Sequence, residues 1–168
     1  MTDKLVLLLF ESWADLDRAV TGLTPGDAST RRHGGSSIAW TVGHVTNMLD
    51  SWINVRFQGM PPNPVISSPD FRTGGRGDAG DWNGIWAAVL EARQTARSFL
   101  ASQSGSDLER VIPYDGSIKF LRAQGLRLRY AVMRIAAHHW MHTGEIETVR
   151  SRMGHTMAAS PDWGKALV

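Results

Sequence analysis

Four stretches of the sequence carry apolar residues at every third or fourth position, and this pattern restricts the fold more than any other feature. The stretches cover about residues 3–21, 37–57, 81–102 and a last one from 121 or 126 to 153. Because each helix is apolar on one side, the four must pack together, which predicts an all-α four-helix bundle. A chain of 168 residues has the size of one domain, so we expect residues 1–168 to form a single domain.

The segments between these stretches carry turn-forming residues. Residues 58–80 form a long stretch rich in Pro, Gly and Ser, which predicts a loop. Its GRGDAG segment, residues 75–80, matches G-x-G-x-x-G, but no buried strand precedes it, so a nucleotide site is not indicated. The segment SGSDLERVIPYDG, residues 104–116, predicts a short hairpin or an irregular arm.

Composition excludes several classes of protein. The net charge is only +2 and no run of Lys or Arg alternates with aromatic residues, so nucleic-acid binding is not indicated. The chain has no cysteine, which excludes disulfides, thiolate metal sites and a cysteine nucleophile and suits the cytoplasm. The apolar run from Leu5 to Phe10 is too short for a membrane span, and no signal-peptide cleavage site follows it. We therefore expect a cytoplasmic protein with no membrane partner.

Three of the six histidines lie within five positions of the last stretch, at His138, His139 and His142. A helix turns about 100° per residue, so His138 and His142 lie about 40° apart on one face. Two imidazoles reach a single metal ion at this i, i+4 spacing. His139 lies about 100° from His138 around the helix, so we do not expect it to reach the same metal ion. The alternative for the pair is a solvated helix face.

His44 is the third candidate ligand. It lies in the middle of the second stretch, where its own face also carries Trp40, Met48 and Val55. Such an imidazole is costly to desolvate unless both of its nitrogens find partners. One alternative is a core histidine hydrogen-bonded to a carbonyl. In a bundle, however, His44 can meet the pair on the last helix, and three neutral imidazoles with open coordination positions are typical of catalytic metal sites.

The segments SSIAWTVGHVTNMLDSW and AAHHWMHTGEI resemble the DinB/YfiT-like superfamily of four-helix metalloproteins. The family pattern places one histidine on the second helix and an H-x-x-x-H pair on the last helix, commonly continued as His-Arg-Gly-Gln. His44 matches the first, and His138 and His142 match the pair. The resemblance covers nearly the whole chain in helix order. Thr143 stands in place of the usual arginine and Glu145 in place of the usual glutamine, so the roles of those two positions do not carry over.

The resemblance implies a divalent metal, often nickel or zinc, held by these three histidines at the open end of the bundle. Characterised relatives include bacillithiol S-transferases and mycothiol-dependent isomerases, whereas others are named only for induction by DNA damage. Since the chain has no cysteine, we expect an external low-molecular-weight thiol, deprotonated at the metal, to attack an electrophilic small-molecule substrate. Nitrogen ligands suit zinc, nickel, iron and copper alike, so the residues leave the identity of the metal open.

Glu145 is the candidate catalytic residue beside these ligands. It can orient His142, act as a base or be a fourth ligand, and the alternative is an ion pair with Arg152 or another arginine of its helix. Arg134, one turn before His138, can bind an acidic substrate group or lie on the surface. A non-catalytic metal-binding or stress-response protein is the rival to an enzyme. A pure interaction module with satisfied histidines is a third alternative.

The last stretch also has a second apolar or small-residue stripe, opposite the histidines. A helix that is apolar on two sides must bury both, so we expect the second stripe to contact another copy of the chain in a homodimer. The alternative is that the N-terminal helix or the tail, residues 157–168, covers it. The stripe consists of Met133, Ala137, Trp140 and Gly144.

Overall fold

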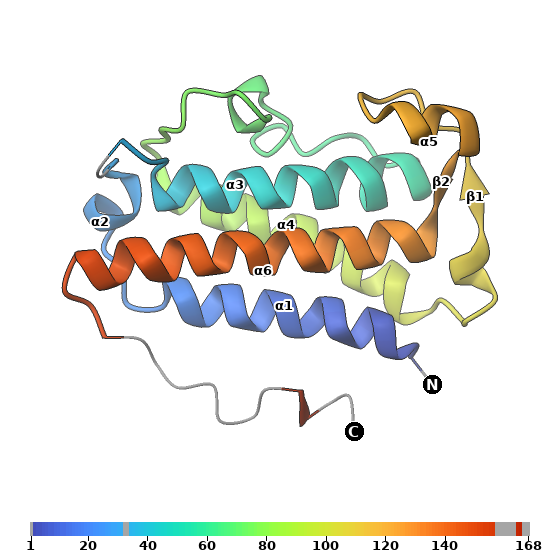
Figure 1. Cartoon of the computed structure of the whole chain (residues 1–168), viewed down its shortest axis with the longest axis horizontal. Helices are drawn as coiled ribbons and strands as arrows, with labels where there is room; N and C mark the ends of the chain where they lie inside the picture. The colour runs from blue at the N-terminus through green and yellow to red at the C-terminus, as the bar shows by residue number, and fades with distance from the viewer. Residues whose placement is uncertain (1, 32–33, 157–163, 166–168) are drawn as a thin grey trace.

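The four predicted stretches form the four long helices of a bundle (Figure 1). The computed structural model describes residues 2–31, 34–156 and 164–165. The bundle helices are α1 (Lys4–Val20), α3 (Ile38–Leu49), α4 (Trp82–Ala101) and α6 (Leu128–Arg152). Helix α6 packs mainly against α1 and α3, and α3 also packs against α4. The prediction of an all-α four-helix bundle is confirmed.

Local sequence explains where these helices begin and end. The side chains of Asp3, Ser37 and Asp81 each accept a hydrogen bond from a backbone N–H in the first turn of the following helix. These bonds satisfy donors that a helix start leaves without a partner. Gly154 follows α6 with a φ of 81°, a left-handed conformation that glycine adopts at low cost.

Helix α2 (Pro25–Ser29) was not predicted, and the end of the second predicted helix has an unexpected winding. Helix α2 has Thr24 as its N-cap and proline at its first position, a start signal that the sequence carried. The element η1 (Asp50–Phe57) lies within the predicted stretch 37–57, but it is a π-helix that continues directly from α3. Such π-helical turns are rare and often occur at functional sites. No sequence pattern marks where α3 changes to the wider winding.

The remaining elements are short and lie in two segments, one between α3 and α4 and one between α4 and α6. The first segment contains η2 (Pro69–Phe71), a 3-10 turn. Residues 104–116 form an irregular arm with one strand and not a hairpin of their own, because that strand pairs antiparallel with one just before α6 and a helix lies between the two. This arm comprises η3 (Asp107–Glu109), β1 (Val111–Ile112), α5 (Lys119–Gln124) and β2 (Leu126–Arg127).

The helix directions explain the long loop between α3 and α4. Figure 1 shows α1 and α6 running in one direction and α3 and α4 in the other. Because α3 and α4 are parallel neighbours, the chain must return along the whole bundle between them. Residues 58–81 make this return, and several of their backbone groups bond to side chains of α3. The connection is therefore part of the site described below.

The core consists of two apolar clusters with buried polar side chains between them. On α6 the first cluster ends at Ala136 and the second begins at Ile146, whereas on α3 they meet between Val45 and Leu49. Burying a polar group costs free energy unless the group finds a hydrogen-bond partner. The partners of the polar side chains between the two clusters therefore indicate their role. Its members include Ser12, Asp15, Thr46, Arg93, His138, His139, His142 and Thr143.

Among the described residues, none of the helices combines the length and the apolar character that crossing a bilayer requires.

Candidate metal centre

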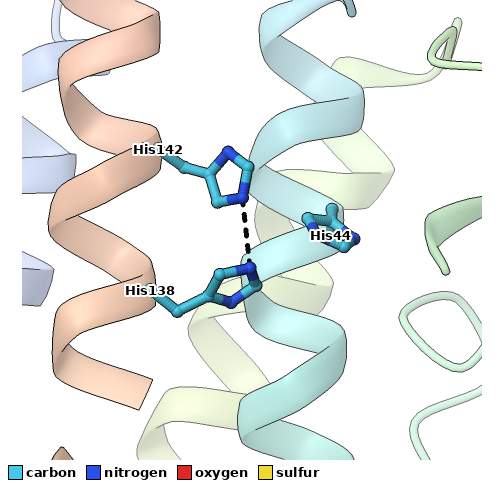
Figure 2. A group of neighbouring side chains, drawn as sticks. All are labelled: His44, His138 and His142. Atoms are coloured by element: carbon cyan, nitrogen blue, oxygen red, sulfur yellow. Dashed lines mark hydrogen bonds between the residues drawn. The ribbon is translucent and has the colours of Figure 1, made fainter. Parts of the chain in front are cut away.

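The three predicted ligands meet between α3 and α6 (Figure 2). His44 lies on α3, and His138 and His142 lie one turn apart on α6. One ring nitrogen from each residue lies within 4.8 Å of those of the other two. The ring centroid of His44 is 5.0 Å from that of His138 and 5.1 Å from that of His142. The expected juxtaposition of distant parts of the chain is therefore present.

Hydrogen bonds fix the tautomer of two of these rings. Nδ1 of His44 lies 2.6 Å from the carbonyl oxygen of Phe71, and Nδ1 of His142 lies 2.6 Å from Oε2 of Glu145. A carbonyl and a carboxylate both accept, so each Nδ1 carries the proton and donates. The Nε2 atoms of His44 and His142 therefore keep their lone pairs, which is the form that binds a metal ion.

His138 is the most strongly perturbed of the three. Burial, with smaller contributions from His142 and His44, lowers the pKa of His138 to about 3. Burial also lowers the pKa of His44, against the opposing effect of its bond to Phe71. Both rings are therefore neutral at pH 7, as metal ligation requires.

The donor set fits a divalent transition metal. Nε2 of His138 and Nε2 of His142 are 3.1 Å apart, and the buried Nδ1 of His138 has no hydrogen-bond partner among the described residues. Two nitrogen lone pairs held so close repel each other unless a proton or a cation lies between them. Three neutral imidazoles are a usual ligand set of catalytic zinc and also suit nickel.

Glu145 is the partner of His142, and its carboxylate is mostly exposed. Within the described part of the chain, Glu145 makes a hydrogen bond with His142 and no ion pair with Arg152. The contact supports a role in orienting the ring, while a role as base or fourth ligand stays a prediction. Arg134 is exposed on α6, as the surface alternative expects.

His139 and Thr143 lie in the same helix but bond elsewhere. His139 is fully buried, and its Nδ1 donates to the carbonyl oxygen of Ile135 at 2.9 Å. It is outside the three-histidine cluster, as its azimuth predicts, and burial lowers its pKa. Thr143 donates its hydroxyl to the carbonyl oxygen of His139. The hydroxyl of Thr143 thus makes its hydrogen bond within α6.

The loop between α3 and α4 is held along α3 close to His44. Trp40 stacks on the His44 ring at a centroid distance of 4.7 Å and donates its indole N–H to the carbonyl oxygen of Asp70. Asn47 donates to the carbonyl oxygen of Ile66 at 2.8 Å. These bonds hold the loop on both sides of His44. The stacking and the carbonyl partner together fix the direction of the imidazole.

Gly43 makes this arrangement possible. A Cβ atom at Gly43 would lie 2.4 Å from Cε1 of the Phe71 ring, which is too close for any side chain. Glycine inside a helix costs about 1 kcal/mol relative to alanine, so its presence beside His44 signals a close approach. The sequence carried this signal, but nothing in it identified Phe71 as the group that approaches.

We predict that Gly43→Ala weakens metal binding. The added methyl group must displace Phe71, whose carbonyl oxygen orients His44, so affinity should fall roughly tenfold or more. Overpacking should also cost about 1–3 kcal/mol of the free energy of unfolding, partly offset by the better helix propensity of alanine. Titration with zinc and urea unfolding measure the two effects.

Gly144→Ala is the matched control, because a Cβ there meets no atom within 4 Å. We expect this variant to be more stable by about 0.5–1 kcal/mol and to bind zinc like the parent. If Gly43→Ala binds zinc as tightly as Gly144→Ala does, the contact with Phe71 does not position His44.

One cavity is lined by two of the three histidines, and a smaller one is lined by Glu145. The larger has a volume of about 760 Å³ and is lined by His44 and His138, by residues of η1 and by the arm around Tyr114. The smaller, of about 410 Å³, is lined by Glu145 with Ile146 and residues from the start of α3. The larger volume is in the range of small-molecule sites. The cluster therefore lies where a small molecule can reach it.

Comparisons with known proteins identify the family and the fold. The family model of the DinB superfamily matches residues 8–146. Among solved structures, the chain is similar to YfiT from Bacillus subtilis, with 19% sequence identity, a TM-score of 0.61, and coverage of 92% of this chain and 88% of that chain. That structure is described as "a probable metal-dependent hydrolase with an unusual four-helix bundle topology". At this identity the likeness shows the fold alone, and no curated protein matches the chain.

Proposed function

The chain belongs to the DinB superfamily, and on that premise we propose that it is a metal-dependent enzyme acting on small molecules. The observation that carries the proposal is the cluster of three imidazoles, two of them oriented by hydrogen bonds, beside a cavity of about 760 Å³. His44, His138 and His142 would hold the metal. A bound divalent cation would supply Lewis-acid activation of a nucleophile.

Residues beside the cluster orient its rings for metal binding. The carbonyl oxygen of Phe71 and the carboxylate of Glu145 keep His44 and His142 in the tautomer that presents Nε2. Glu145, which lines the smaller cavity, is exposed enough to pass a proton to solvent. The cavity side of the cluster, where His44 and His138 are lining residues, is where we place the substrate.

We propose that the nucleophile is an external low-molecular-weight thiol, so that the reaction is an S-transfer or a thiol-dependent isomerisation. The chain has no cysteine, so a thiol must come from outside it. A hydrolase that uses water is the second candidate, and the description of the similar YfiT structure favours it. The two candidates use the same ligands and differ only in the nucleophile.

The test is to incubate the zinc- or nickel-loaded chain with an electrophilic nitroarene and with an activated ester, each with and without a panel of physiological thiols. Turnover that requires both metal and thiol supports the S-transferase proposal. Turnover of the ester without thiol supports the hydrolase. The control is His44→Ala, which should be inactive in either case. No turnover with any thiol or with water would count against an enzyme.

A non-catalytic metal-binding or stress-response protein is the rival class, and His142→Ala separates it from an enzyme. A structural metal contributes its binding free energy to folding, so losing it should lower the melting temperature strongly. A catalytic site should mostly lose metal, with a small change in melting temperature. Calorimetry of the parent and of His142→Ala, each with and without zinc, measures the difference.

We also propose that the chain forms a homodimer through the outer face of α6. Trp140 of the predicted stripe lies partly buried against α1 and donates its indole N–H to Asp15, so the N-terminal helix covers this part of the stripe, as the alternative expects. Met133 and Met141 on the outer face are 49% and 53% exposed, large values for apolar side chains. Tail residues 157–163 and 166–168, expected as an alternative cover, lie outside the described residues.

The double variant Met133→Lys/Met141→Lys is expected to be monomeric, because four buried cations would face one another across a symmetric interface. Light scattering at micromolar concentration should give twice the monomer mass for the parent and the monomer mass for the variant. A monomeric parent would contradict the proposal.

A further inference from the structure

The cavity beside His44 and His138 has a polar wall that the three-histidine cluster does not explain. Its lining comes from η1, from the loop between α3 and α4, and from the arm before α5. Two arginines, Arg56 of η1 and Arg72 of the loop, are among the lining residues. They come from segments distant in sequence, so the fold places two guanidinium groups on the wall of one small-molecule cavity.

Arg56 already binds a carboxylate. Its Nη1 lies 2.6 Å from Oδ1 of Asp115, and its guanidinium lies 4.9 Å from the centroid of the Tyr114 ring. The side chain of Arg56 is 25% exposed, but that of Asp115 is 88% exposed. An ion pair whose acidic partner is this exposed contributes little and exchanges readily with another carboxylate. Tyr114 instead holds the guanidinium on the cavity side.

Arg72 is available for a ligand. It is exposed and makes no ion pair or side-chain hydrogen bond with the described residues. Arg72 directly follows Phe71, whose carbonyl oxygen accepts a hydrogen bond from Nδ1 of His44. The backbone that orients a proposed metal ligand therefore also carries this second cation.

The acidic group of the cavity does not cancel these charges. Asp50 is the carboxylate among the lining residues, and it is buried. One of its oxygens accepts from the side chain of Asn54 and the other from the backbone N–H of Asn63. Both oxygens of Asp50 are thus used in hydrogen bonds that connect η1 with the loop. The rest of the wall is apolar or neutral, with Met48, Trp52 and Val55 next to the arginines.

We propose that this cavity binds a small-molecule carboxylate with an apolar body, and that Arg56 and Arg72 recognise its carboxylate. The planar guanidinium of arginine matches a carboxylate with two parallel hydrogen bonds. Trp52, Val55 and Met48 accommodate the apolar part, and Asp115 leaves Arg56 when the ligand enters. The inference deepens the proposed function, on which it rests for the role of the bound molecule as substrate.

Benzoate is the test probe, with benzamide as its neutral analogue. Calorimetric titration of the full chain, treated with chelator and separately loaded with zinc, should show tighter binding of benzoate than of benzamide in both forms. Arg56→Gln and Arg72→Gln should each weaken benzoate binding roughly tenfold, since a charge-assisted bond is lost. Arg56→Lys should restore part of the affinity, and Asp115→Asn should increase it.

Arg76→Gln is the matched control, because this arginine of the same loop is 77% exposed and does not line the cavity. It should bind benzoate like the parent. Equal binding of benzoate and benzamide, or unchanged benzoate binding in both Arg56→Gln and Arg72→Gln, would overturn the proposal. Circular dichroism of each variant verifies that a loss of binding is not a loss of fold.

The chelated arm separates this inference from the proposed function. Benzoate selectivity without any zinc binding would support the carboxylate site and contradict the metal-dependent enzyme. Zinc binding without benzoate selectivity would contradict the carboxylate site and leave the metal-dependent enzyme supported. Benzoate binding that appears only after zinc is added and survives Arg56→Gln would mean that the metal itself takes the carboxylate, which also overturns the proposal.

Discussion

Replacing His138 with alanine is expected to reduce the bound metal from about one ion per chain to almost none. His138 contributes the ring nearest to His142 and is neutral at pH 7, because burial lowers its pKa to about 3. Even residues that only orient a metal ligand contribute about 10- to 100-fold to affinity. Loss of a ligand should therefore weaken binding by more than about 100-fold. Elemental analysis of chain purified without a histidine tag, and competition with a chelator, measure the change.

His139→Ala is the control for this experiment. His139 is adjacent in sequence and fully buried, but it lies outside the cluster and bonds to Ile135. Its removal should lower stability, through a cavity in the core, while metal stoichiometry stays near that of the parent. If His138→Ala and His139→Ala retain equal amounts of metal, the three-histidine cluster does not bind it.

Asp17→Asn is expected to be the most destabilising of the surface substitutions, because Asp17 neutralises a buried arginine. Only 6% of the Arg93 side chain is exposed, and its Nη1 donates to Asp17. Its Nε and Nη2 have no hydrogen-bond partner among the described residues, and Trp13 and Trp86 lie beside the guanidinium. Burial lowers the pKa of Arg93, and Asp17 opposes that effect.

Removing the carboxylate leaves the cation buried without a counter-charge, which costs about 3 kcal/mol in comparable pairs. Urea unfolding should show this loss with an unchanged dependence on denaturant concentration. Asp78→Asn is the control, since Asp78 pairs with the exposed Arg76 and should cost less than about 0.5 kcal/mol. The double variant Asp17→Asn/Arg93→Met should recover most of the stability, because no charge remains buried. Equal stabilities of Asp17→Asn and Asp78→Asn would contradict this account.

The amino-acid sequence by itself determined the helices and the geometry of the histidine pair. Helical periodicity and the caps at Asp3, Ser37 and Asp81 are local properties, so the starts of α1, α3 and α4 could be predicted within a few residues. The spacing of His138 and His142 follows from the pitch of a helix, whatever surrounds it. That His44 joins them followed from the apolar surroundings of an imidazole and from the resemblance to a known family.

Only the tertiary structure decided what holds and surrounds these rings. Nδ1 of His44 donates its hydrogen bond to the carbonyl oxygen of Phe71, 27 residues away. Every residue has such a carbonyl, so no residue type could have identified it. Arg56 and Arg72 line one cavity only because the loop after η1 returns along the bundle. Periodicity records which side of a helix is buried, but the partner that buries it is chosen by contacts between distant segments, and these appear only when the chain has folded.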